Sequence, residues 1–173
     1  MKNKRKRTEK IALMGLTASL ALLLSYVEFL LPPLFIAVPG IKVGLPNVVI
    51  LFSLYVLGIK YAVLISITRV IISSMWFGSP LTLAYSLAGA VLSLLLMSIL
   101  YKIDKLSAVG VSVAGGVTHN LGQVFVAMIL LDTPQIAYYM IVLAVTGTVS
   151  GIFIGLCGAI LIKRIPKNKI FKY

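Results

Sequence analysis

Long apolar stretches separated by short loops dominate this sequence and restrict the folds open to it. A helix needs about 20 apolar residues to cross the hydrocarbon core of a bilayer. When prolines, glycines and charged residues are taken as boundaries, six candidate spans remain: 11–31, 43–57, 61–77, 81–101, 106–131 and 135–162. Hydrophobic residues make up 60% of the chain and charged residues only 12%, which is more apolar surface than a soluble domain of 173 residues buries.

These spans predict an all-α integral membrane protein with six transmembrane helices. One transmembrane domain at residues 11–162 lies between basic tails at residues 1–10 and 163–173. Cytoplasmic segments of membrane proteins carry the excess of Lys and Arg. If both tails are cytoplasmic, 14 of the 16 basic residues fall on that side, and the exceptions are Lys42 outside and Arg69 within a span. The net charge of +12 therefore indicates membrane orientation and contact with lipid, and does not indicate nucleic-acid binding.

Polar side chains interrupt the fifth span within the sequence Gly115-Gly116-Val117-Thr118-His119-Asn120-Leu121-Gly122-Gln123. On a helix, His119 and Gln123 share a face, and Asn120 lies one turn before Gln123. Polar groups in hydrocarbon are costly unless they are paired, so they usually face other helices or a wet cavity. Hydrogen bonds between helices are one interpretation of this cluster. We favour the other, a ligand-facing role for His119, Asn120 and Gln123, because Arg69 is expected at similar depth.

Arg69 lies near the middle of the third span, where an arginine is a candidate functional residue. It either contacts a ligand, which would then be anionic or strongly polar, or pairs with Glu28 or with helix-end carbonyl groups. Glu28, near the end of the first span, is either that partner or reaches the lipid headgroups. Asn47 follows Pro46, and it either caps a helix that begins there or lines the same site.

Small residues recur in three spans and allow close contact between helices. In the fourth and sixth spans we expect them to pack within the protein, and the sixth contains the repeat Gly147, Gly151 and Gly155. In the first span they could instead form a docking face for a membrane partner: Gly15, Ala18 and Ser19.

Several kinds of catalytic site are missing from the sequence. The four acidic residues are scattered, so no Asp-rich motif is present to hold magnesium and diphosphate. His119 and Cys157 are the only residues of their types and lie far apart, which excludes a zinc site between them. We therefore expect no metal, no cofactor and no catalytic residues, and we predict a binding component and not an enzyme.

The segments GIKVGLPNVVILFSLYVLG at 40–58 and THNLGQ at 118–123 resemble a bacterial membrane family. This family is known as heptaprenyl diphosphate synthase component I and as the Gx transporter family. It looks related to the substrate-binding S components of energy-coupling factor (ECF) transporters, which are six-helix proteins. The resemblance implies location in the bacterial plasma membrane, a small-molecule ligand, and docking to a transmembrane T subunit with cytoplasmic ATPases.

Two functions are therefore expected from the sequence. The first is a substrate-binding component of a small-molecule uptake transporter, with a site formed by Arg69, His119, Asn120, Gln123, Asn47 and Glu28. The alternative follows from the family name: a membrane accessory subunit of heptaprenyl diphosphate synthase in isoprenoid or quinone synthesis. Without Asp-rich motifs, such a subunit would not be catalytic.

Overall fold

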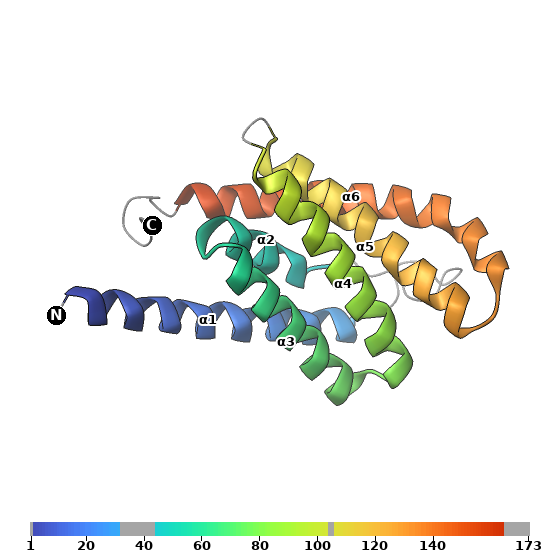
Figure 1. Cartoon of the computed structure of the whole chain (residues 1–173), viewed down its shortest axis with the longest axis horizontal. Coiled ribbons are helices and arrows are strands. Elements are labelled where there is room, and N and C mark those ends of the chain that lie inside the picture. The colour runs from blue at the N-terminus through green and yellow to red at the C-terminus, as the bar shows by residue number, and fades with distance from the viewer. Residues whose placement is uncertain (1, 32–43, 104–105, 165–173) are drawn as a thin grey trace.

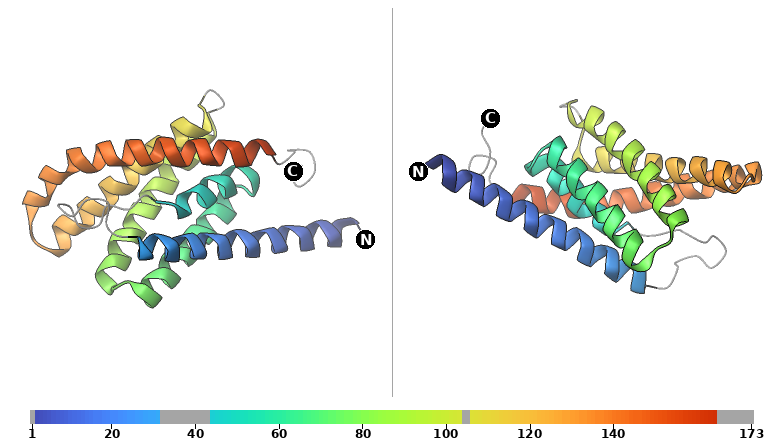
Figure 2. Two further views of the ribbon diagram at one scale, coloured as in Figure 1. Left: turned by 180° about the vertical axis from the view of Figure 1, so that it is seen from behind. Right: turned by 60° about the horizontal axis from the view of Figure 1, so that its bottom comes forward.

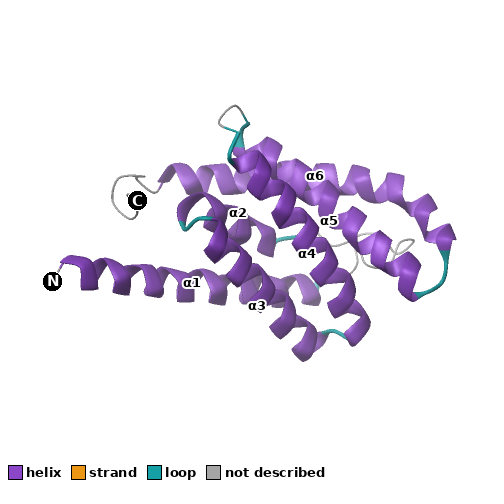
Figure 3. Cartoon of the chain, in the orientation of Figure 1, coloured by secondary structure: helices purple, strands orange, loops and turns teal. Residues whose placement is uncertain are grey.

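The computed structural model describes residues 2–31, 44–103 and 106–164, and every element in these ranges is helical (Figure 3). In chain order the elements are α1 (Lys2–Leu30), α2 (Pro46–Val56), α3 (Ile59–Phe77), α4 (Pro80–Tyr101), α5 (Ala108–Leu130), the 3-10 helix η1 (Pro134–Tyr139) and α6 (Met140–Arg164). The prediction of an all-α membrane protein with six α-helices is confirmed. Five of them are long and apolar enough to cross a bilayer, which makes this a multi-pass membrane protein.

The second helix is shorter than the predicted span at 43–57. α2 has 11 residues, or about 16 Å of helix, against the roughly 30 Å hydrocarbon core of a bilayer. Its start is fixed by Pro46 in the first turn and by Gly44, whose φ of +78° is left-handed. Its end is fixed by Gly58, with φ of +94°, which turns the chain directly into α3. The predicted loop at 32–42 lies outside the described residues.

The start of α1 and the end of α6 lie at the same end of the bundle, which we call the basic end (Figure 1). The turn between α2 and α3 also lies toward this end, whereas the turns between α3 and α4 and between α5 and η1 lie away from it (Figure 1). Ser79 closes the α3–α4 turn, since its hydroxyl accepts a hydrogen bond from the Thr82 backbone N–H at 3.2 Å. The two ends of the described chain therefore share one side, as six predicted spans require.

Glycines bring α5 into close contact with α6 and α4. A Cβ atom at Gly151 would lie 2.7 Å from Cα of Val113, and one at Gly155 would lie 2.7 Å from Cα of Val109. On the α4 side, a Cβ atom at Gly122 would lie 3.0 Å from the carbonyl oxygen of Ala88. Only hydrogen fits at such distances, so the prediction that small residues in the fourth and sixth spans pack within the protein is confirmed.

The helix α1 packs mainly against α2 and α3, on the opposite flank of the bundle from α6 (Figure 2). Ala21 and Thr17 are buried in this contact. In contrast, Gly15 and Ser19 are exposed, and a Cβ atom at Gly15 would meet nothing within 4 Å. Ala18, the third residue of the predicted docking face, is half-buried against the core. Two residues of the predicted docking face, Gly15 and Ser19, thus lie on an open surface, unlike the glycines of α4 and α6.

Candidate functional site

A cavity of about 320 Å³ lies among the helices, in the part of the bundle away from the basic end. Its wall combines the end of α1, the start of α2, the second half of α3, the start of α4 and the middle of α5 and α6. All six residues predicted for the site line it: Glu28, Asn47, Arg69, His119, Asn120 and Gln123. The structure therefore brings together side chains that are up to 95 positions apart, from Glu28 to Gln123. Their role in binding stays a prediction.

Arg69 contacts Asn47 across the cavity wall. Its Nη2 donates a hydrogen bond to Oδ1 of Asn47 at 3.4 Å, which joins α3 to the first turn of α2. Asn47 is not the cap of α2, because Leu45 occupies that position and no side chain caps the helix. The prediction that Asn47 serves as a cap is therefore wrong, and the reason is that Pro46 begins the helix one residue earlier.

Glu28 joins the end of α1 to the start of α2. Its Oε1 accepts hydrogen bonds from the backbone N–H groups of Gly44 and Leu45. Backbone N–H groups at a helix start lack acceptors within the helix and carry partial positive charge, so a carboxylate is stabilised there. Among the residues that the structure describes, Glu28 forms no ion pair with Arg69. Neither predicted role of Glu28, as partner of Arg69 or as contact to headgroups, describes these bonds.

The polar side chains of α5 bond to one another and to α6. Nε2 of Gln123 lies 3.2 Å from Nε2 of His119. An amide nitrogen only donates, so this contact is a hydrogen bond in the tautomer of His119 whose Nε2 is free to accept. Asn120 donates from Nδ2 to the carbonyl oxygen of Leu143 at 2.6 Å, which ties α5 to α6. Gly89 of α4 makes room for this part of α5, because a Cβ atom there would lie 2.7 Å from the carbonyl oxygen of His119.

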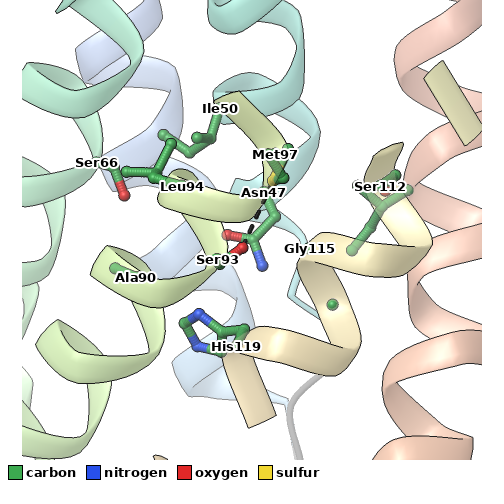
Figure 4. Close-up of a pocket in the computed structure, with 12 residues that line it drawn as sticks. Asn47, Ile50, Ser66, Ala90, Ser93, Leu94, Met97, Ser112, Gly115 and His119 are labelled. Carbon is green, nitrogen blue, oxygen red and sulfur yellow. Dashed lines mark hydrogen bonds between the residues drawn. The ribbon is translucent and has the colours of Figure 1, made fainter. Parts of the chain in front are cut away.

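A smaller cavity of about 20 Å³ adjoins the large one and shares Asn47 and His119 with it (Figure 4). Serines from three helices line its other side: Ser66, Ser93 and Ser112. Ser93 is hydrogen-bonded to the sulfur of Met97 at 3.5 Å. The volume suits about one water molecule, so this cavity is too small for a solute. Its serines continue the polar wall of the large cavity beyond Asn47 and His119.

Comparison with known protein families assigns the chain to a family. The family model described as heptaprenyl diphosphate synthase component I matches residues 17–161. The chain belongs to this family. No curated protein and no solved structure matches the chain. The resemblance drawn from the segments at 40–58 and 118–123 is confirmed at the level of this family.

In this member of the heptaprenyl diphosphate synthase component I family, six hydroxyl side chains also line the cavity. They were not assigned to the site from the sequence: Ser25, Ser73, Ser74, Thr82, Ser86 and Ser150. A signal for two of them was present, because Ser73 lies one helical turn after Arg69 and Ser74 follows it. Twelve of the nineteen lining residues carry polar side chains, although the exposed surface of the wall is more apolar than polar.

Proposed function

We propose that this protein is the substrate-binding membrane component of a small-molecule uptake transporter and has no catalytic activity of its own. The observation that carries the proposal is the polar cavity, to which all six helices contribute. Ligand sites are concave, with volumes of roughly 300–1,000 Å³, and a few convergent polar groups fix the ligand. A cavity of about 320 Å³ that contains a cation, a carboxylate and three amide side chains matches that description for a small polar solute.

The orientation of the cavity supports uptake. The basic side chains at the start of α1 and the end of α6 favour a cytoplasmic basic end in the bacterial plasma membrane. The cavity then lies in the outer half of the membrane domain, where it would receive a solute from outside. In the resemblance to ECF transporters, energy comes from a T subunit and cytoplasmic ATPases, and we extend that arrangement to this chain.

Thiol labelling in intact cells tests this orientation. In a chain whose Cys157 is replaced, cysteines at Ser79 and Thr133 are expected to react with an impermeant reagent, and a cysteine at Lys60 is not. Ser79 and Thr133 lie in turns away from the basic end, and Lys60 lies next to the α2–α3 turn toward it. Labelling of the Lys60 position from outside would overturn the orientation. Labelling of all three positions after permeabilisation is the control for access.

Partner docking is tested on the exposed face of α1. Gly15→Leu or Ser19→Leu is expected to reduce by about tenfold the amount of transmembrane partner recovered with the tagged protein, because bulk separates two closely packed helices. The fold should persist, since nothing lies within 4 Å of a Cβ atom at Gly15. Val149→Leu, on the exposed face of α6, is the matched control. Equal recovery with all variants would argue against this docking face.

The family description favours a second candidate function, a membrane accessory subunit of heptaprenyl diphosphate synthase. The two functions differ in the molecule that the cavity holds. Mass spectrometry of small molecules retained after gentle purification from native membranes separates them. A vitamin-like solute supports the transport component, and a prenyl diphosphate or a quinone precursor supports the accessory subunit. The charged and amide side chains that converge on the cavity favour the former, because an isoprenoid chain has no group for them to bind.

A further inference from the structure

We infer that the solute in the cavity is a compact acid: its carboxylate or phosphate group pairs with Arg69, and N–H or O–H donors at its other end bind the amide oxygens of α5. This inference rests on the proposed function, since it names the class of solute that the same cavity takes. Three features of the wall lead to this inference. Within the part of the chain that the structure describes, Arg69 on α3 has no ion-pair contact, the carboxylate of Glu28 on α1 is hydrogen-bonded to the start of α2, and two amide oxygens on α5 have no hydrogen-bond donor.

The guanidinium of Arg69 has no ion-pair partner at contact distance among the described residues. Of its five N–H donors, one forms a hydrogen bond, to Asn47 at 3.4 Å, and the buried Nε has no partner. Within the described ranges 2–31, 44–103 and 106–164, no carboxylate oxygen lies within 4.0 Å of it. A cation inside a membrane domain is costly unless an anion pairs with it. Two oxygens of a carboxylate or phosphate group fit the planar fork of donors and supply the missing acceptors.

Glu28 lines the same cavity and attracts Arg69 electrostatically, but it is not in ion-pair contact with it. Its Oε1 already accepts the backbone N–H groups of Gly44 and Leu45 at the positive end of α2. The carboxylate of Glu28 is therefore bound by the start of α2, while most N–H donors of Arg69 are left for the solute. The cavity consequently selects a negative group at the α3 side.

The α5 part of the wall presents acceptors. Asn120 uses an Nδ2 donor on Leu143, and Gln123 uses an Nε2 donor on His119. The structure gives no partner within its described residues to Oδ1 of Asn120 or to Oε1 of Gln123. Both residues are only half-buried and neither oxygen is among the buried atoms without a partner, so these oxygens are open to the cavity and can accept hydrogen bonds from whatever fills it. A volume of about 320 Å³ keeps the two recognised ends of the solute close together.

A thermal-shift experiment on the purified protein in detergent tests the inference. The probes are small carboxylic acids and phosphate monoesters with hydroxyl or amino groups, each beside its uncharged amide or ester of similar size. A ligand that binds only the folded protein raises the melting temperature with its concentration. We expect at least one acid to raise it, its uncharged partner to fail, and Arg69→Met to weaken binding of that acid by tenfold or more. Lys60→Met, which removes an exposed cation far from the cavity, should bind the acid as wild type does.

Arg69→Lys keeps the charge and removes the planar fork, so it should bind the acid more weakly than wild type and more tightly than Arg69→Met. If Arg69→Met does not fold, the affinity of Arg69→Lys for the acid is the test of the inference. The inference is overturned if no acid stabilises the protein more than its uncharged partner does. It is also overturned if stabilisation survives in both Arg69 variants, or if phosphatidylglycerol alone has the effect and shows that a lipid headgroup fills the site.

Failure of the inference and failure of the proposed function are distinguishable. If a neutral or cationic solute binds the cavity and is taken up by cells that make the protein, the transport function stands and the acid is wrong. If an acid binds through Arg69 but uptake of it is the same in cells with and without the protein, the acid stands and the transport function falls.

Discussion

Gly151→Leu is expected to unfold the α5–α6 half of the bundle. A Cβ atom at this position would lie 2.7 Å from Cα and 3.2 Å from the backbone nitrogen of Val113, and 3.0 Å from the carbonyl oxygen of Ser112. These atoms belong to the backbone of α5, so no rotamer change relieves the clash. Overpacking of a tight contact costs about 3 kcal/mol, and here the helices must separate. We expect loss of the cooperative melting transition, or a drop of many degrees, when melting is followed by circular dichroism in detergent.

The matched control for this change is Gly15→Leu, which makes the same substitution in a helix of the same bundle. Because nothing lies within 4 Å of a Cβ atom there, the melting temperature should stay at the wild-type value or rise slightly, as leucine favours helix over glycine. Comparable melting of Gly151→Leu and wild type would show that α5 and α6 do not pack as closely as the structure has them.

Glu28→Ala is expected to cause the second large loss, about 1–3 kcal/mol of stability, because two backbone N–H groups at the start of α2 lose their acceptor. Glu28→Gln should lose less, since its amide oxygen still accepts while the charge is gone. Melting temperatures of the two variants in detergent measure the difference, and hydrogen exchange should show the loss concentrated in α2. Equal losses in both variants would indicate that the charge of Glu28 is what matters, as in an ion pair with Arg69.

The helical spans were predictable because hydropathy and the prolines and glycines that end helices are local properties of the sequence. Pro32 and Gly78 mark helix ends in the sequence, and α3 to α6 begin and end within several residues of the predicted bounds. The length of α2 was misjudged because Val43, Gly44 and Leu45 are apolar enough to continue a span. The left-handed backbone at Gly44, which ends the possibility of helix there, is not visible in hydropathy.

The charged, imidazole and amide members of the candidate site were predictable from the sequence, whereas its hydroxyl groups and its hydrogen bonds were not. Charge and amide groups are rare in these spans, so Arg69 and His119 could be found by their cost in hydrocarbon. Their partners depend on the relative rotation and depth of helices, which one sequence does not reveal. For this reason the sequence left Asn47 open between a helix cap and a site residue, and it did not place Glu28 on the backbone of α2.

The glycine-lined contacts of α5 with α4 and α6 also determine which helices can move relative to one another. Helices whose backbones touch behave as one stiff body, because any shift meets repulsion at once. α1, by contrast, packs mainly on α2 and α3. The cavity lies on the seam between the stiff body and this second group, with Arg69 on one side and Gln123 on the other. A solute that binds Arg69 at one end and Gln123 at the other would therefore connect the two groups of helices. The angle between these groups would then differ between the solute-bound and the solute-free protein.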